Sequence, residues 1–468
     1  MSPSYSNDID WQQFKAALGD IATLDNPRLL QAKSRDFYWY SPILKRQLDG
    51  FCADLVAQPK DIEELTHTIA LAYRERVPVT LRGRGSGNYG QAVPLAGGLV
   101  IEMTRLDDII DIGPDTVRVQ SGCNVHRLNE ALRVHGRELP IFSSTQRIAT
   151  IGGFIGGGSG GIGSIEHGPL REPGNIIEIS ALSIESSPRL HHFTGDDINC
   201  IHHAWGMNGV IAELTLKTAP ARDWINCIAS FESYRHAFDA AHALGQRVDL
   251  NRKLACSVDA AFTPYMSKLA DYLQAGRHHV LTLIDRPHVD AFKTLVIEQG
   301  GRTDLELDES EMASAGLPHV FEFAYNHTTL QVLNHDRTVT YLQVTVPPPI
   351  DADGVERLWH DFGDEVLMHH EFSRFNGDLY AADLPVVRYT TDERLYAIME
   401  TYEQAGFPVA NPHTYLVEEG GMKSADYRHL AWKKRLDPEG LLNPGKSKAW
   451  DDLKHLSPEA IEALDMAE

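Results

Sequence analysis

The sequence has 468 residues, of which 43% are hydrophobic and 23% are charged, and its formal net charge is −22. A chain of this length is too long to fold around one simple core, so two or three domains are expected. The acidic balance argues against nucleic acid or an anionic membrane surface as the main partner, and no stretch approaches the roughly 18 apolar residues of a membrane span.

The five cysteines are scattered and never form a CxxC pair. This usage fits a reducing compartment and supports neither a zinc site nor a disulfide framework. Four histidine doublets also lack a carboxylate at a familiar ligand spacing, so no metal is expected. The first residues have neither the basic nor the apolar region of a secretory signal. We therefore expect a cytoplasmic protein.

From residue 55 the chain alternates short helices and strands. Pro59 and Asp61 are helix-start signals, and apolar residues then recur at helical spacing from Ile62 to Tyr73. The following patterns predict strands over 77–83 and 97–103, a hairpin over 106–122, a capped helix over 124–136, and strands over 175–186 and 209–220. Together these elements predict an α+β domain over about residues 40–220.

The strand at 77–83 runs into a glycine-rich turn, "RGRGSGNYG" (82–90). In open α/β domains such a turn binds phosphate groups. Gly85, Gly87 and Gly90 can be aligned with the dinucleotide GxGxxG motif. However, the next residues contain Pro94 and lead to a strand, so no helix N-terminus is available for a pyrophosphate. The backbone N–H groups of the loop would have to bind it, which disfavours a nicotinamide-binding Rossmann fold and favours a different FAD fold.

A second glycine run, "ATIGGFIGGGSGGIGS" (149–164), has glycine at eight of the twelve positions from 152 to 163. A flexible linker would have no reason to keep large apolar residues, yet this run holds Ile151, Phe154, Ile155 and Ile162. Because glycine has no Cβ, its backbone can approach a ligand closely. The run therefore predicts a packed segment against a large flat molecule.

The pattern changes near residues 219–224, and longer strands and helices follow. A proline-rich join, "VTVPPPIDADG" (344–354), marks an internal boundary in this region. We expect a second domain with its own sheet. The tail, residues 432–450, is predicted to form a helix, a turn and an extended end.

Five motifs occur in an order that resembles one enzyme family: "RGRGSGNYGQAVPLAGGLVIEM", "TIGGFIGGGSGGIGSIEHG", "GNIIEI", "HAWGMNGVIAELTL" and "LDPEGLLNPGK". The sequence is similar to the FAD-linked oxidases related to vanillyl-alcohol oxidase, which have the PCMH-type FAD-binding fold. The resemblance covers about residues 45–220 and the tail. It implies an α+β protein with a two-subdomain PCMH-type FAD-binding domain in 1–220, an inserted α+β substrate (cap) domain in 221–410, and a C-terminal segment, 411–468, that returns to the FAD domain.

The resemblance also implies which residues contact FAD. The first loop would hold the pyrophosphate, the second glycine run would meet the diphosphate and the isoalloxazine, residues 209–211 would meet the adenine end, and the tail would reach the flavin ring. The implied residues are Arg82, Gly83, Arg84, Gly85, Ser86, Gly87, Asn88, Gln91, Thr150, Gly152, Gly153, Gly156, Gly157, Gly158, Ile162, Gly163, Gly209, Val210, Ile211, Asn443 and Lys446.

Two departures from the family pattern concern FAD attachment. Many relatives attach FAD covalently through a histidine of the first loop, and some add a cysteine before the second loop. Here Ser86 stands in place of that histidine, and Ile148 or Ala149 stands near the cysteine position. We therefore predict non-covalent FAD at this loop, with attachment to a histidine of the second domain left as the alternative.

A further departure concerns the substrate. Relatives that resemble D-lactate and D-2-hydroxyglutarate dehydrogenases carry a "GEHG" motif upstream of the tail, whereas residues 411–423 here hold His413, Tyr415 and Glu418 without that spacing. This puts a metal-assisted mechanism and a 2-hydroxy-acid substrate in doubt. Flavin oxidation still needs a base near the substrate. His413, Tyr415 and Glu418 are the predicted candidates, with Arg388 and Tyr389 as substrate anchors, because an arginine fork suits a carboxylate.

The resulting prediction is an FAD-dependent oxidoreductase that oxidises an alcohol, a hydroxy acid or an amine by hydride transfer to flavin N5, with oxygen or another electron acceptor. The alternative is a non-catalytic FAD-binding subunit that relays electrons within a larger complex. The middle region of about 185 residues favours the enzyme, since a relay needs no substrate domain. The expected partner is a small-molecule substrate, and a homo-oligomer is compatible with the sequence.

Overall fold

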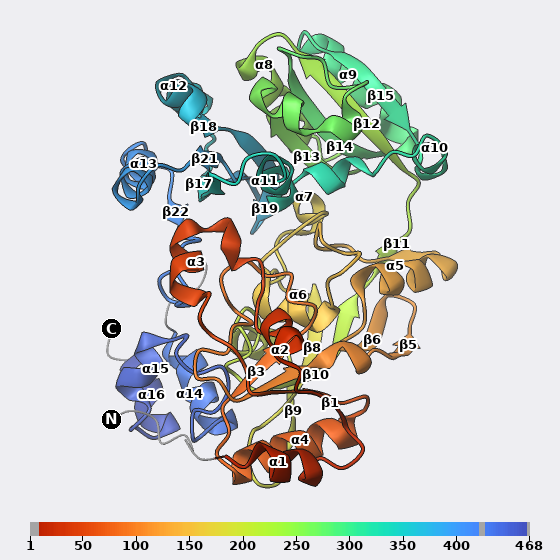
Figure 1. The fold of residues 1–468 in the computed structure, drawn as a ribbon. Helices are drawn as coiled ribbons and strands as arrows, with labels where there is room; N and C mark the ends of the chain where they lie inside the picture. Colours follow the sequence, from red (N-terminus) through yellow and green to blue (C-terminus); the bar gives the residue numbers. More distant parts are fainter. Residues whose placement is uncertain (1–8, 421–425, 466–468) are drawn as a thin grey trace.

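The computed structural model describes residues 9–420 and 426–465. The chain forms two lobes, one built from its first half and its tail, the other from its middle region (Figure 1). Both lobes combine helices with sheets, which confirms the predicted α+β class. We call the first the FAD lobe, after the expectation above, and the second the cap lobe.

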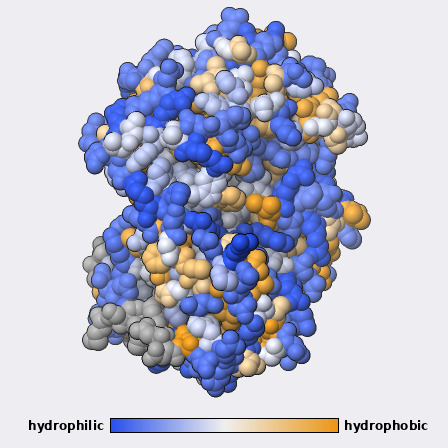
Figure 2. Space-filling model, in the orientation of Figure 1, coloured by the Kyte–Doolittle hydropathy of each residue, from blue (hydrophilic) through white to orange (hydrophobic). Residues whose placement is uncertain are grey.

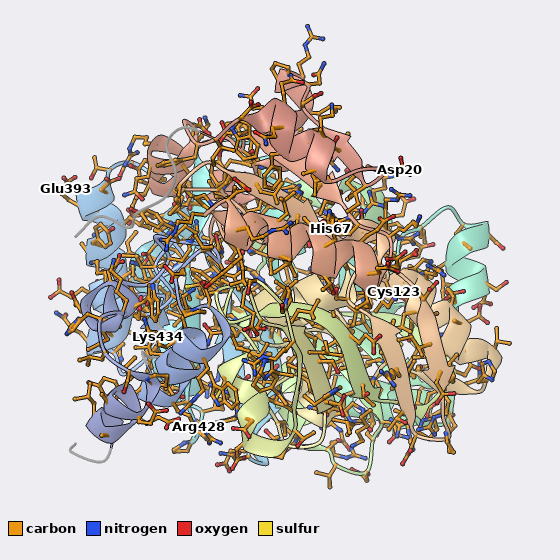
Figure 3. All side chains as sticks on the ribbon, turned by 90° about the horizontal axis from the view of Figure 1, so that it is seen from below. Asp20, His67, Cys123, Glu393, Arg428 and Lys434 are labelled. Atoms are coloured by element: carbon orange, nitrogen blue, oxygen red, sulfur yellow. The ribbon has the colours of Figure 1, made fainter. Side chains whose placement is uncertain are left out.

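The first sheet of the FAD lobe has the strand order β1 (Ala22–Leu24), β2 (Leu55–Gln58), β4 (Leu99–Glu102), β3 (Val79–Arg82). Strands β2, β4 and β3 are parallel. Helices α1 (Trp11–Ala17) and α4 (Ile62–Arg74) share a buried apolar cluster with these strands. As the sequence predicts, Asp61 caps α4, and its carboxylate accepts the N–H of Glu64 at 2.8 Å. His67 of α4 (Figure 3) contacts the carbonyl of Ala17, which joins the two helices.

The second sheet of the FAD lobe is antiparallel. Its order is β5 (Ile109–Ile112), β6 (Thr116–Gln120), β10 (Val210–Lys217), β8 (Ile176–Leu182), β9 (Leu190–Phe193). The predicted hairpin and both predicted strands are thus present. The capped helix is α5 (Val125–Val134), which begins after Asn124. The second glycine run forms a short helix, α6 (Ile151–Gly157), because Ile151, Phe154 and Ile155 are buried in the core.

The cap lobe is built on an eight-stranded antiparallel sheet. Its order is β15 (Arg302–Leu307), β12 (Trp224–Phe231), β14 (His278–Asp285), β13 (Arg252–Val258), β19 (His369–Phe375), β20 (Asp378–Asp383), β17 (Gln343–Val346), β22 (Val409–Ala410). Helices α8 (Tyr234–Gln246), α9 (Val289–Glu298), α12 (Ala352–Phe362) and α13 (Asp392–Gln404) contribute to one apolar cluster with these strands. The sheet lies between these helices and the FAD lobe (Figure 1).

Shorter elements complete the two lobes. They are α2 (Pro27–Lys33), α3 (Pro42–Leu48), α7 (Ser164–His167), α10 (Glu309–Ser314) and α11 (Asn326–Leu333), the strands β16 (Val339–Tyr341), β21 (Val386–Arg388) and β18 (Val366–Leu367), and the pair β11 (Ala219–Pro220) and β7 (Arg137–Glu138).

The tail lies against the FAD lobe. It forms α14 (Tyr427–Leu436), α15 (Lys448–Leu453) and α16 (Pro458–Asp465), and Arg428 and Lys434 of α14 are visible beside this lobe in Figure 3. Between α14 and α15, the N–H of Asn443 donates to the carbonyl of Val79 at 2.7 Å, so the tail runs along β3. The predicted extended end is wrong, because the Ser447 hydroxyl caps α15 by accepting the N–H of Trp450, a buried residue.

Strand β19 carries buried titratable side chains. Burial lowers the pKa of His369 to about 3 and raises the pKa of Glu371 to about 7. The Glu371 carboxyl accepts the N–H of Tyr325 at 2.6 Å through Oε1, whereas Oε2 has no hydrogen-bond partner among the described residues. Burial therefore favours the protonated form of this carboxyl.

We predict that Glu371→Gln stabilises the protein at pH 8 but not at pH 4.5. A carboxyl with a raised folded-state pKa favours folding below its unfolded value, near 4.5, and this contribution is lost as the pH rises to about 7. The amide mimics the protonated acid, so the gain at pH 8 should reach at most about 3 kcal/mol. Urea unfolding at both pH values measures it, and an equal effect at the two would contradict the buried, protonated carboxyl.

Candidate flavin and substrate site

A cavity of about 1080 Å³ lies where the two lobes meet. Both glycine segments line one side, and residues of β17, β19 and β20 line the other. Figure 2 shows the waist between the lobes, which is largely hydrophilic on this face. Pockets for small ligands typically measure about 300–1000 Å³, so this cavity has room for a dinucleotide and a small second molecule.

The first glycine loop, residues 82–91, has its carbonyls bound from outside the cavity. The N–H of Phe37 donates to Gly87 O at 2.7 Å, and the Lys446 ammonium donates to Gly90 O at 2.6 Å. The Asn443 amide donates to Gln91 O at 2.9 Å. In contrast, the N–H groups of residues 85–87 have no acceptor among the described residues. The loop therefore offers backbone donors to the cavity, as an anion-binding nest does.

Three buried charges support this loop. The carboxylate of Asp36, at the cavity wall, accepts the N–H groups of Tyr38 and Ala92. The guanidinium of Arg82 donates to the carbonyls of Arg35 and Arg84. Burial lowers the pKa of Lys446 to about 7 and raises the pKa of Asp36, and the two charges attract each other. These groups hold the loop in place through hydrogen bonds and charge.

Glycine is required in both segments because neighbouring groups fill the space that a side chain would occupy. A Cβ on Gly152 would overlap Ser121, and a Cβ on Gly83 of the first loop would overlap the Thr150 hydroxyl. The two segments are also joined directly, since the Gln91 amide donates to Gly157 O at 3.2 Å. Both loops thus form one continuous wall of bare backbone.

The cap side of the cavity is lined by polar and aromatic side chains. Ser373 of β19 and Tyr380 of β20 are cross-strand partners, and both line the cavity. Tyr325 reaches across the lobes and donates its hydroxyl to Gly161 O at 2.7 Å. The Gln343 amide donates to the hydroxyl of Tyr89 from the first loop. This wall can hydrogen-bond a hydroxylated molecule.

Most residues predicted to bind FAD line this cavity. They are Arg82, Gly83, Arg84, Gly85, Ser86, Gly87, Asn88, Gln91, Thr150, Gly152, Gly153, Gly156, Gly157, Gly158 and Ile211.

Six other predicted residues lie behind the wall rather than on it. Gly163 has a φ of 103°, and a Cβ there would overlap the carbonyl of Pro140. Ile162 bridges to Phe142 in the core, Gly209 packs beside Leu436, and Val210 is buried. Asn443 and Lys446 contact the backbone of the first loop, as described above. Their position indicates support of the loop.

The structure does not bring the predicted catalytic residues to the cavity lining. His413 is buried, and its Nδ1 lies 2.8 Å from the Ser41 hydroxyl. Tyr415 packs under Lys446, and Glu418 accepts a hydrogen bond from Ser447. None of the three lines the cavity, and only Tyr415 lies beside the first loop, next to Gly90.

The two predicted anchors also have partners elsewhere. Arg388 pairs with Asp336 and donates to the carbonyl of Asp364, and Tyr389 donates to Asp392. Neither lines the cavity.

The cap-side residues that do line the cavity were not predicted. Tyr325 follows no glycine motif and belongs to the region without a family resemblance, so no sequence signal marks it. Tyr380 and Ser373 meet only through strand pairing.

Tyr89 and Trp205 lie beside predicted motif residues, and their rings stack at 5.7 Å. Proximity to the motifs could have identified this second pair.

The described residues show no group of three or more His, Cys, Asp or Glu side chains able to hold a metal ion. Within the same residues, no helix is long and apolar enough to cross a membrane.

Comparisons with known proteins identify an FAD-binding domain in the FAD lobe. Residues 53–179 match the family model described as an FAD binding domain. Glycolate oxidase subunit GlcD of Escherichia coli is 26% identical over 442 residues, which is 86% of this chain and 86% of that protein. GlcD of Bacillus subtilis is 24% identical over 87% of this chain and 91% of that protein. D-2-hydroxyglutarate dehydrogenase of Pseudomonas putida is 32% identical over 30% of this chain and 14% of that protein.

Solved structures share the fold. An alkyldihydroxyacetonephosphate synthase matches 95% of this chain and 86% of its own with a TM-score of 0.69 at 14% identity. A Physcomitrella patens BBE-like 1 variant matches 92% of this chain and 97% of its own with a TM-score of 0.63 at 12% identity. The FAD lobe with its antiparallel-sheet cap is therefore the expected PCMH-type architecture. The chain belongs to the FAD-linked oxidase family with the PCMH-type FAD-binding domain, and it is an FAD-linked oxidoreductase.

Proposed function

We propose that this enzyme binds FAD non-covalently and oxidises a small hydroxylated substrate, with 2-hydroxy acids as the first class to test. The observation that carries the proposal is the cavity itself, which has bare backbone donors on one side and a polar cap wall on the other. The relatives named for glycolate and D-2-hydroxyglutarate oxidation support the hydroxy-acid class, although the tail lacks the motif expected for it.

Non-covalent binding is supported by the side chains around the cavity. Among the described lining residues there is no cysteine, and Ser86 occupies the first loop. The lining histidines, His202 and His203, belong to the FAD lobe. We propose that the free N–H groups of residues 85–87 bind the diphosphate.

The cap wall would hold the substrate against the flavin. When bound, FAD would supply the two-electron acceptor for a hydride from the substrate carbon, and the proton of the oxidised hydroxyl would be released to the solvent. Burial raises the pKa of Tyr325 and of Tyr380, so both are protonated at neutral pH. Their hydroxyls, with that of Ser373, would orient the substrate hydroxyl by hydrogen bonds.

The alternative function is an electron-relay subunit without a substrate. The word "subunit" in the names of the GlcD relatives is compatible with a partner chain. However, a relay gives no reason for a polar cap wall beside the glycine segments. The electron acceptor and any partner stay open in both cases.

The first prediction from this proposal concerns the attachment of FAD to the protein. Precipitation of the yellow protein with acid should release the flavin to the supernatant, because no covalent bond retains it. The visible flavin absorbance of the two fractions gives the answer. Yellow colour that stays in the pellet would refute non-covalent binding and make His202 and His203 the first attachment candidates.

The second prediction concerns the support of the first loop. Lys446→Met removes the donor to Gly90 O and should weaken FAD binding by about tenfold or more, as expected for a buried charged hydrogen bond. Fluorescence titration of the apoprotein measures the affinity. Lys448→Met is the matched control, since Lys448 is an exposed cation that pairs with Glu419. Thermal unfolding of both apoproteins separates loop support from a general loss of stability, and equal FAD affinities would exclude the supporting role.

The third prediction concerns the reaction. Anaerobic addition of a 2-hydroxy acid should bleach the flavin absorbance, because two electrons pass from the substrate to the cofactor. Glycolate, both lactate enantiomers and both 2-hydroxyglutarate enantiomers form the first panel, followed by neutral alcohols and amines. Reduction by only alcohols or amines would move the substrate class. A flavin that no member of the panel reduces would favour the relay subunit.

A further inference from the structure

The proposed substrate needs a binding partner for its non-reacting end. The described cavity lining holds three arginines, Arg82, Arg84 and Arg171. Arg82 is buried under the first glycine loop and bonded to carbonyls, and Arg84 belongs to the same loop. Arg171 is different because it lies next to the cap wall. It forms no ion pair with any described residue.

Arg171 is held in place by contacts on both sides. It follows α7, and the N–H of its neighbour Leu170 donates to Ser159 O of the second glycine segment at 2.8 Å. On the cap side its guanidinium lies 4.4 Å from the ring centroid of Phe375 at the end of β19. A guanidinium that stacks on an aromatic face keeps its N–H groups available, because they lie in its own plane and not against the ring. The group is therefore oriented but still able to bind an anion.

The hydroxyl groups of the cap wall lie at the same end of the cavity. Phe375, Ser373 and Tyr380 are on the β19–β20 hairpin and all line the cavity. Burial raises the pKa of Tyr380 and the charge of Arg171 partly offsets this rise, which shows that the two groups are electrostatic neighbours. One molecule can thus meet a guanidinium and a hydroxyl together.

We propose that Arg171 binds the carboxylate of the substrate, while Tyr380 hydrogen-bonds its hydroxyl. This inference rests on the proposed function and assigns the specificity for an acid to one side chain. It replaces Arg388, which the structure places away from the cavity. The guanidinium supplies two parallel N–H groups that match a carboxylate.

Acidic groups near Arg171 make its positive charge more important for the binding of an anion. Asp378, the first residue of β20, lines the cavity, and the Glu172 carboxylate accepts the N–H of Asn376 in the turn of the same hairpin at 3.3 Å. Without Arg171, Asp378 would still line this end of the cavity, and the lining arginines would be Arg82 and Arg84 of the first loop, in a protein of net charge −22. An anion would then be repelled, so the loss of this one cation should cost more than a single hydrogen bond.

The test compares Arg171→Met with Arg337→Met in the FAD-loaded protein. Methionine keeps an apolar contact with the ring but removes the charge. Arg337 is the matched control because it also stacks on an aromatic ring, Trp39, at 4.8 Å but does not line the cavity. Calorimetry with oxalate, a dicarboxylate that the proposed reaction does not consume, measures binding. We expect Arg171→Met to bind it at least about tenfold more weakly than the wild type and Arg337→Met to bind it equally.

Kinetics then separates acids from neutral substrates. For the best hydroxy acid, KM should rise at least about tenfold in Arg171→Met with a smaller change in kcat. The rate with 1,2-propanediol should not fall, and Arg171→Lys should restore part of the acid affinity. Unchanged oxalate binding, or an equal loss for acid and diol, would overturn the inference. So would weaker FAD binding with unchanged acid affinity, which would assign Arg171 to the cofactor.

The two proposals fail in different ways. If no hydroxy acid reduces the wild-type flavin but oxalate binding still depends on Arg171, the reaction is wrong and the carboxylate site stands. If hydroxy acids reduce the flavin equally well in the wild type and in Arg171→Met, the reaction stands and the carboxylate site is wrong.

Discussion

An acidic chain that binds a dinucleotide must present positive potential where the diphosphate lies. Here the solution is largely a matter of backbone orientation. The carbonyls of Gly87, Gly90 and Gln91 are bound from behind by Phe37, Lys446 and Asn443, so the loop cannot turn them toward the cavity. The N–H groups of residues 85–87 are left as donors. Fixing the carbonyls thus determines the sign of the ligand that the loop accepts.

The same constraint brings together two segments that are far apart in the sequence. The groups that hold the loop come from residues 36–38 and 443–446, which are about 400 residues apart. The tail reaches them by running along β3, where Val79 bonds to both Leu441 and Asn443. Ligand binding and folding are therefore coupled. A ligand that binds the loop in this conformation stabilises the contacts between the loop and the tail.

The sequence predicts what depends on local signals. Asp61 and the apolar spacing after it are sufficient to place α4, and glycine without Cβ explains why the backbone at Gly83 and Gly152 must be bare. The cap-side site depends instead on strand pairing and on the contact between lobes, neither of which is written in a short motif. His413 and Tyr415 show the same limit. Their position near the tail motif suggested proximity to the flavin, but His413 is bonded to Ser41 and Tyr415 packs under Lys446, and neither lines the cavity. Arg171 lies close after a recognised motif, yet only the fold shows that Phe375, about 200 residues later, orients it.

The two walls of the cavity differ in how they can change. Recognition on the FAD side uses backbone groups, and substituting a glycine there meets Thr150 or Ser121 rather than solvent, so the wall tolerates little variation. The cap side recognises through side chains of a hairpin, Ser373, Phe375 and Tyr380, whose strand pairing does not depend on their identity. A substitution there alters the charge and hydrogen bonding offered to a substrate without moving the loop that holds the cofactor. It follows that one lobe can retain FAD while the other acquires a different substrate. Relatives of low sequence identity therefore indicate the cofactor of this chain much more firmly than they indicate its substrate.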